Sequence, residues 1–198
     1  MDSPHLFPDN NITPAGIISE AFIQRNIRSF HAACDYVLRM PYGYNTDRDD
    51  LMSLFAEGKG TCTTKHAVIG TLALELGLPI RKHIGIYAMT EALVTGTSAI
   101  LNKYALPFLP MVHCFLADAT HRADLTEGNR NGKNGPIDEF LYTVKVEPNI
   151  SAKDEYLLYR KALKEHILNQ GELAAIPLKT VLQAREEGLA LLKRNIRA

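Results

Sequence analysis

The segment from Cys62 to Leu76 constrains the fold more than any other part of the chain, because it is apolar on almost every face of a helix. Its apolar residues are Ala67, Val68, Ile69, Leu72, Ala73, Leu74 and Leu76. Gly77 and Pro79 end the pattern, since glycine readily forms a left-handed cap and proline cannot continue a helix. A helix of this kind belongs inside a protein, so we expect it at the centre of the fold.

The composition narrows the class of protein. The 198 residues are 46% hydrophobic and hold 22 Lys and Arg against 22 Asp and Glu, so we expect one compact domain over residues 1–198. Zero net charge without a run of like charges is not the footprint of a nucleic-acid binder. The N-terminus lacks the pattern of a secretory signal, and no apolar run could span a bilayer, so we expect a cytoplasmic protein without membrane association.

The order of the predicted elements is typical of an α+β fold, because helices come first, mostly antiparallel strands follow and helices close the chain. We expect helices at residues 14–39, 50–56, 62–76, 90–104, 152–169 and 178–194. We expect strands at residues 80–88, 111–117, 120–126 and 139–146, with a Gly- and Asn-rich loop at 128–136. The last two helices each carry an apolar stripe, which fits packing within the domain or against a second copy in a homodimer.

Cys62 is the residue that most directly suggests chemistry. The three cysteines, Cys34, Cys62 and Cys114, cannot all pair, so we expect reduced thiols. Cys62 follows a Gly-Lys-Gly-Thr segment at 58–61 and begins the predicted buried helix, where unpaired N–H groups and the helix dipole favour a thiolate. The same N–H groups could stabilise an oxyanion. The alternative interpretation is that Cys62 is simply a small buried apolar residue.

A base and a carboxylate for this thiol are available on the predicted hairpin. If Asp118 and Ala119 form a two-residue turn, Ala117 pairs with Thr120 and the register places His113 directly opposite Asp124. A carboxylate there would orient the imidazole, as the third member of a nucleophile, base and orienter set does. Taken singly, His113 could be a half-buried strand histidine bonded to backbone, and Asp124 a strand-end residue bonded to its own turn. Together, a helix-start Cys, a strand His and a carboxylate on the paired strand form a specific order that favours a cysteine enzyme.

The chain resembles the transglutaminase-like superfamily of cysteine enzymes at three places. The first is Gly60-Thr61-Cys62 with the helix that follows and its Leu-Gly-Leu-Pro turn at 76–79. The second and third are the segments 113–116 (His-Cys-Phe-Leu) and 123–126 (Ala-Asp-Leu-Thr). The match covers about residues 47–126. It implies a papain-like α+β fold in which a central helix packs on an antiparallel sheet, with Cys62 as the nucleophile, His113 as the general base and Asp124 as the orienting carboxylate.

The sequence departs from the family at two of these positions. Phe115 and Leu125 stand where family members often have Trp and Pro, and the chain contains no Trp. The tryptophan that helps to hold the oxyanion in some members therefore has no counterpart. Tyr42, Tyr44 and Asn45 are candidates for that role or for substrate binding, and the alternative is that their loop is only a turn.

The chemistry implied is acyl transfer on an amide bond without a cofactor. Cys62 would attack the carbonyl of a peptide, a protein or a small amide, and a thioester would pass to water or to an amine. Water as acceptor makes the protein a peptidase or amidase, and an amine makes it a transamidase. The absence of an Asp-x-Asp-x-Asp-Gly pattern argues against a calcium-switched transglutaminase.

Three other functions fit parts of the sequence. A metal site could use Cys62 and His66, which are four apart on one helical face, with ligands from the set His83, His113, Cys114 and His121. A catalytically inactive module could keep the fold and bind a peptide or protein in its groove. A phosphate-binding loop at 58–61 is the most remote, because its spacing is not that of a P-loop.

Overall fold

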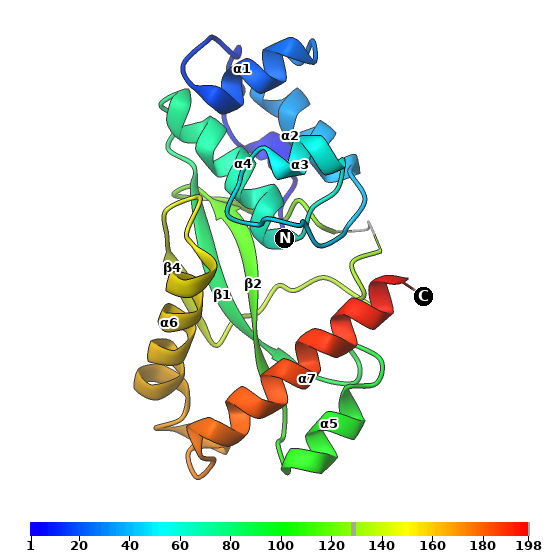
Figure 1. The fold of residues 1–198 in the computed structure, drawn as a ribbon. Helices are drawn as coiled ribbons and strands as arrows, with labels where there is room; N and C mark the ends of the chain where they lie inside the picture. Colours follow the sequence, from blue (N-terminus) through cyan, green and yellow to red (C-terminus); the bar gives the residue numbers. More distant parts are fainter. Residues whose placement is uncertain (128–129, 198) are drawn as a thin grey trace. The chain divides into compact units, whose positions relative to one another are not determined.

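The computed structural model describes residues 1–127 and 130–197, and over these it is an α+β fold as the sequence predicts (Figure 1). Its α-helices are α1 (Ile17–Gln24), α2 (Phe30–Arg39), α3 (Ser53–Glu57), α4 (Cys62–Glu75), α5 (Thr97–Tyr104), α6 (Ala152–Ala162) and α7 (Leu178–Arg197). The strands β1 (Arg81–Met89), β2 (Leu109–Ala117), β3 (Arg122–Ala123) and β4 (Tyr142–Lys145) form an antiparallel sheet in the order β3-β2-β1-β4. Residues 128 and 129 of the expected loop lie outside the described part.

The chain divides into two compact units. The first unit comprises Met1–Ile84, Cys114–Asn129 and Val144–Ser151, and the second comprises Gly85–His113, Arg130–Thr143 and Ala152–Ala198. Strands β1 and β2 each begin in one unit and end in the other. The expectation of one domain over residues 1–198 stays a prediction.

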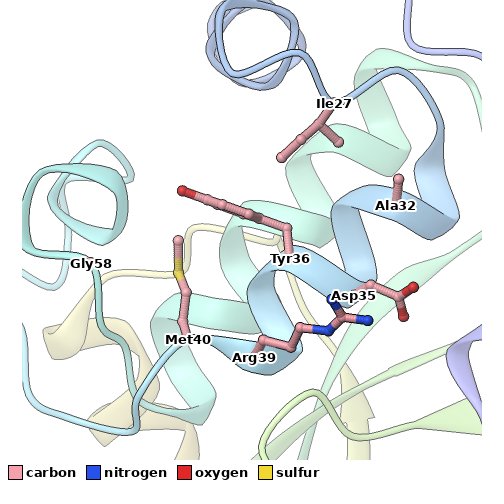
Figure 2. A pocket seen from close by; sticks show the side chains of 7 residues that line it. All are labelled: Ile27, Ala32, Asp35, Tyr36, Arg39, Met40 and Gly58. Atoms are coloured by element: carbon pink, nitrogen blue, oxygen red, sulfur yellow. The ribbon is translucent and has the colours of Figure 1, made fainter.

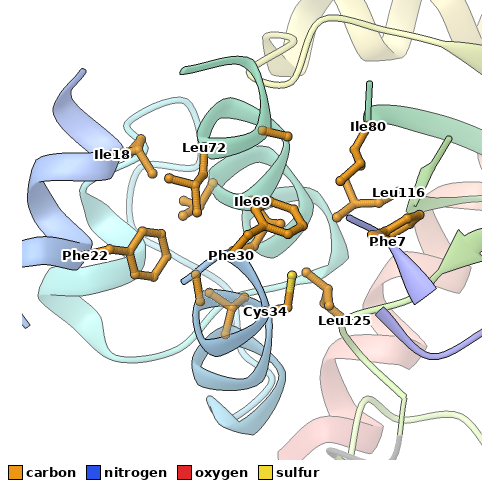
Figure 3. Close-up of a cluster of buried hydrophobic side chains, with 14 of the residues drawn as sticks. Phe7, Ile18, Phe22, Phe30, Cys34, Ile69, Leu72, Ile80, Leu116 and Leu125 are labelled. Atoms are coloured by element: carbon orange, nitrogen blue, oxygen red, sulfur yellow. The ribbon is translucent and has the colours of Figure 1, made fainter. Parts of the chain in front are cut away.

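Helix α4 lies at the centre of the first unit, as its composition predicts. Val68, Ile69 and Leu72 are fully buried, and so are the polar side chains of Lys65 and His66 on the same helix. Side chains from α1, α2 and the segments that flank β1 and β3 join α4 in one core, which Figure 3 shows around Ile69 and Leu72. The α4 helix therefore contributes both the apolar centre of this unit and the polar groups discussed below.

The predicted helix over residues 14–39 is wrong in its middle, where the chain forms two helices. Helix α1 ends at Gln24, and Asn26 adopts a left-handed conformation with φ of 58°. Asparagine tolerates this conformation better than most residues. Ser29 then begins α2, because its side chain accepts a hydrogen bond from the N–H of Ala32 at 3.3 Å.

Three further predicted elements are shorter than expected, and one of them is the strand predicted over 120–126, which is limited to β3, from Arg122 to Ala123. The helix expected from residue 90 begins only at Thr97, after Gly96 with φ of 94°. A left-handed glycine breaks the helical backbone at that point. The strand expected over 139–146 is limited to β4, from Tyr142 to Lys145.

The register between β2 and β3 also differs from the prediction. Leu116 pairs with Ala123 and Ala117 with Arg122, so residues 118–121 form a four-residue loop. The carboxylate of Asp118 accepts hydrogen bonds from Thr120 and His121 and closes this loop, as Asx turns do. The predicted two-residue turn, and the register that sets Asp124 directly opposite His113, are therefore wrong. The shift is two residues, which keeps each side chain on its predicted face.

The second unit has its own apolar core around α5, α6, α7 and the parts of β1 and β2 that belong to it. Tyr159 of α6 is fully buried, and its hydroxyl donates a hydrogen bond to the carbonyl of Pro110 at 2.8 Å. Leu157 on the same helix is 47% exposed, and the expected homodimer stays a prediction. Within the described residues, no helix combines the length and the apolar character that a membrane crossing requires.

A carboxylate at the far end of α4 caps α1. The backbone N–H groups of Ile18 and Ser19 donate to the two carboxylate oxygens of Glu75, at 3.1 and 2.6 Å. Gly16 permits this approach, since a Cβ atom at residue 16 would collide with the Glu75 carboxylate. A negative charge at a helix N-terminus satisfies unpaired donors and opposes the helix dipole, so Glu75 stabilises α1.

We expect Glu75→Ala to lower the free energy of unfolding by about 1–2 kcal/mol, the usual cost of losing a helix cap. Urea unfolding followed by circular dichroism measures the effect. Glu139→Ala is the control, because Glu139 is exposed and belongs to the other unit. Equal stability of the two variants would contradict the capping role.

Candidate active site

Cys62 is the first residue of α4 and lies at the N-terminus of that helix. Thr61 is the N-cap residue, and the first helical hydrogen bond runs from the Lys65 N–H to the Thr61 carbonyl at 3.0 Å. Among the first N–H groups, that of Cys62 donates to the Tyr42 hydroxyl and that of Thr64 to the Thr61 side chain in a capping box. The dipoles of this turn favour negative charge near Cys62. Cys62 is 8% exposed, whereas Cys34 and Cys114 are completely buried.

Backbone conformation and packing explain the two glycines that precede Cys62. Gly58 ends α3 in a left-handed conformation with φ of 62°. A Cβ atom on Gly60 would lie 2.7 Å from both Leu54 Cδ1 and Thr64 Oγ1, so only glycine fits there. Turn and packing geometry account for the Gly-Lys-Gly-Thr segment without a bound phosphate.

Tyr42 lies against the sulfur of Cys62. The backbone of its loop pairs with the segment before α4 through hydrogen bonds from Gly60 to Pro41 and from Gly43 to Gly60. The Tyr42 hydroxyl is 4.0 Å from Cys62 Sγ and also accepts a hydrogen bond from the Cys62 N–H. Burial and the nearby sulfur raise the pKa of Tyr42 well above its usual value, so its hydroxyl keeps its proton and can donate it in a hydrogen bond.

The other two loop candidates differ from Tyr42. Tyr44 is 38% exposed, and burial of its hydroxyl, with a contribution from the Cys62 sulfur, raises its pKa to about 12. The Asn45 amide donates to the carbonyls of Lys59 and Ser53 at 3.0 and 3.4 Å and accepts from Thr64 Oγ1 at 2.8 Å. Both amide hydrogens of Asn45 are therefore engaged, and this residue shapes the loop that carries Tyr42.

Asp124 is buried directly after β3 and has a fixed orientation. Its Oδ1 accepts hydrogen bonds from the Thr126 N–H at 2.8 Å and the Thr126 hydroxyl at 2.7 Å. The Asp-x-Thr spacing noted in the sequence thus forms a local turn around the carboxylate. Thr126 holds Asp124 in one rotamer, which is the property needed of a carboxylate that orients another group.

His66 is the residue of this site whose role the sequence did not reveal. It is completely buried, and its Nδ1 lies 2.7 Å from the Cys62 carbonyl oxygen, while the Leu125 N–H donates to its Nε2 at 2.8 Å. A backbone N–H can only donate, so Nε2 has no proton and Nδ1 donates to Cys62. Asp124 Oδ1, 3.5 Å from the same Nε2, therefore forms no hydrogen bond with it. The only signal in the sequence was the spacing of four between Cys62 and His66.

His113, the predicted base, is on the part of β2 that belongs to the second unit. It is 1% exposed, and its ring packs edge-on against Tyr87 with centroids 6.4 Å apart. Cys62, Tyr42 and Asp124 are brought together in the first unit. That His113 lies close to Cys62 and to Asp124 stays a prediction.

The geometry gives little support to a metal site. Within residues 1–127 and 130–197, no three His, Cys, Asp or Glu side chains gather in a way that could hold a metal ion. Both ring nitrogens of His66 are engaged with backbone groups, so His66 has no lone pair to offer a metal beside Cys62.

Lys65, the neighbour of His66, is a fully buried cation. Its Nζ donates to the carbonyl oxygens of Met40, Leu38 and Leu125 at 2.6, 3.4 and 3.5 Å. Two of these carbonyls belong to the C-terminal end of α2, where a cation is favoured. Burial lowers the pKa of Lys65 to about 8, and the nearby charge of Asp124 opposes that shift.

A hollow of about 500 Å³ lies beside α2, and its lining includes Met40, the residue whose carbonyl binds Lys65 (Figure 2). Its lining consists of Ile27, Ala32, Asp35, Tyr36, Arg39, Met40 and Gly58. The lining contains no thiol and no imidazole, and the Asp35 carboxylate accepts a hydrogen bond from His5 at 2.8 Å. The hollow therefore lacks the groups that would link it to chemistry at Cys62.

Comparison with known proteins found no relative of this chain. No family model matches the chain, no curated protein matches it, and no solved structure matches its fold. The site is therefore characterised by its own residues: a thiol at a helix N-terminus, a phenol on that thiol, and a buried imidazole between the thiol-bearing turn and an oriented carboxylate.

The lowered pKa of Lys65 predicts a pH dependence of stability. Between about pH 8 and pH 10.5 the folded protein has lost the Lys65 proton while the unfolded chain retains it. The unfolded state then binds more protons, so stability rises with pH through this window. Below pH 8 Lys65 is protonated in both the folded and the unfolded state. Folding then carries the full free-energy cost of burying its charge.

We therefore expect the unfolding free energy of the wild type, relative to Lys65→Met, to increase by on the order of 2–3 kcal/mol from pH 7 to pH 10.5. Urea titrations of both proteins at several pH values measure this difference. Lys164→Met, at an exposed position, should show a constant difference from the wild type. A constant difference for Lys65→Met as well would refute the lowered pKa.

Proposed function

We propose that this protein is a cysteine-dependent enzyme of transglutaminase-like type that transfers acyl groups from amide bonds. In this proposal the Cys62 thiol loses its proton to His113, and the thiolate attacks the carbonyl carbon of the amide. His113 returns the proton to the leaving amine, and the acyl group remains on Cys62 as a thioester. Water or a second amine then takes the acyl group, so the substrate is a peptide, a protein or a small amide.

One observation carries the proposal: Cys62 and the segment of Asp124 meet on the two sides of a single buried imidazole. His66 donates to the Cys62 carbonyl and accepts from the N–H of Leu125, the residue after Asp124. The turn that carries the thiol and the segment that carries the oriented carboxylate thus bind the same ring, although they are far apart along the chain. The proposal adds His113 as the base that takes the proton from Cys62, with Asp124 as the carboxylate that orients it.

Tyr42 supports the proposal because its hydroxyl can serve as the oxyanion donor, the role that a tryptophan has in some members of the family. A tetrahedral intermediate at Cys62 places negative charge on the former carbonyl oxygen, close to the sulfur. The Cys62 N–H and the Tyr42 hydroxyl both lie at that place and are now hydrogen-bonded to each other. When a substrate oxygen enters and replaces the hydroxyl as acceptor, the fixed Cys62 N–H and the rotated Tyr42 hydroxyl can both donate to it, which is the function of an oxyanion hole.

Selective alkylation tests the nucleophile. We expect iodoacetamide at about pH 6 to modify Cys62 roughly tenfold or more faster than Cys34 or Cys114, measured by peptide mass spectrometry. Burial and the negative charges of Asp35 and Asp9 raise the pKa of Cys34, which keeps it as an unreactive thiol. His113→Asn should remove the preference for Cys62. Equal, slow labelling of all three thiols would indicate a binding module without catalysis.

Acyl transfer can be followed with 4-nitrophenyl acetate, whose leaving group is coloured. We expect release of nitrophenol together with an acetyl adduct on Cys62 in the intact mass spectrum. Cys62→Ser should abolish the thioester adduct, while Cys114→Ser, which changes a second thiol of the first unit near α4, should retain it. Adding a simple primary amine shows whether the acyl group passes to the amine or to water. Turnover that persists in Cys62→Ser would argue against Cys62 as the nucleophile.

A further inference from the structure

His66 and Lys65 lie next to each other on α4, and both side chains hold the same peptide segment. The Leu125 N–H donates to His66 Nε2 at 2.8 Å, and the Leu125 carbonyl accepts from Lys65 Nζ at 3.5 Å. Both backbone groups of the residue after Asp124 are therefore bound by two consecutive residues of the helix that begins with Cys62.

The other hydrogen bonds of Lys65 and His66 are made with the remaining parts of the site. His66 Nδ1 donates to the Cys62 carbonyl at 2.7 Å, which fixes the ring to the first turn of α4. Lys65 Nζ donates to the Met40 carbonyl at 2.6 Å, two residues before Tyr42. The pair thus contacts the backbone at or close to Cys62, Tyr42 and Asp124.

We propose that the pair of Lys65 and His66 is a clamp that positions the nucleophile turn, the Tyr42 loop and the Asp124 segment relative to one another. His66 is a positioning residue and not a base in this assignment, because its neutral ring with the proton on Nδ1 uses both nitrogens to hold backbone groups. The inference rests on the proposed function, since it explains how the three parts of that site keep their geometry.

The tautomer of His66 gives the first test, in the wild-type protein. Proton–nitrogen NMR of the imidazoles distinguishes a nitrogen that carries a proton from one that does not. We expect the His66 signals to show a protonated Nδ1 and an unprotonated Nε2 at pH 7. A proton on Nε2, or a doubly protonated ring at that pH, would overturn the clamp.

Substitutions separate positioning from simple packing. His66→Leu removes both hydrogen bonds, while the carbonyl oxygen of Gln in His66→Gln can still accept from the Leu125 N–H. We expect His66→Leu to slow the alkylation of Cys62 at pH 6 by roughly tenfold or more, and His66→Gln to restore much of the rate. His5→Leu, at an exposed histidine, should have the wild-type rate.

The outcome distinguishes the two proposals. If the wild type shows no preference for Cys62, the proposed function fails and not merely the clamp. If the wild type prefers Cys62 and the folded His66→Leu variant keeps that rate, the clamp alone is refuted. If His66→Leu does not fold, Lys65→Met gives the second variant: slowed alkylation of Cys62 supports the clamp, and a wild-type rate in the folded variant refutes it.

Discussion

The burial of α4 on nearly all its faces is the constraint on which the first unit depends. A polar group inside a protein must find a hydrogen-bond partner, because an unsatisfied one costs free energy comparable to a lost hydrogen bond. Lys65 and His66 are both completely buried on this helix, and their partners are backbone groups of other segments. The polar side chains of α4 therefore form hydrogen bonds with segments that are distant in sequence, while its apolar side chains form the core.

This constraint also separates the roles of two histidines. His66 is engaged at both ring nitrogens, which excludes it from proton transfer while its contacts persist. His113 is buried on β2 beside Tyr87 and is the imidazole to which the proposal assigns the proton. The first histidine is then a part of the scaffold, and the second is the part that would change protonation state during turnover.

Features that depend on local patterns were predictable from the sequence. The apolar run after Cys62 and the Gly and Pro that follow it gave α4 almost to the residue, and β1 followed from its alternation. Features that depend on a single polar contact were not. The register of β3 follows from the Asp118 side chain closing a longer loop, and the break between α1 and α2 follows from the left-handed Asn26. The role of His66 was hidden because its partner, Leu125, is 59 residues away.

The contact between Glu75 and α1 affects the order in which parts of the chain can become stable during synthesis. Helix α1 has only eight residues, too few to be stable in water by itself. Its cap comes from a carboxylate 57 residues further along the chain than Ile18. During synthesis, α1 therefore gains this cap only after Glu75, the last residue of α4, has left the ribosome.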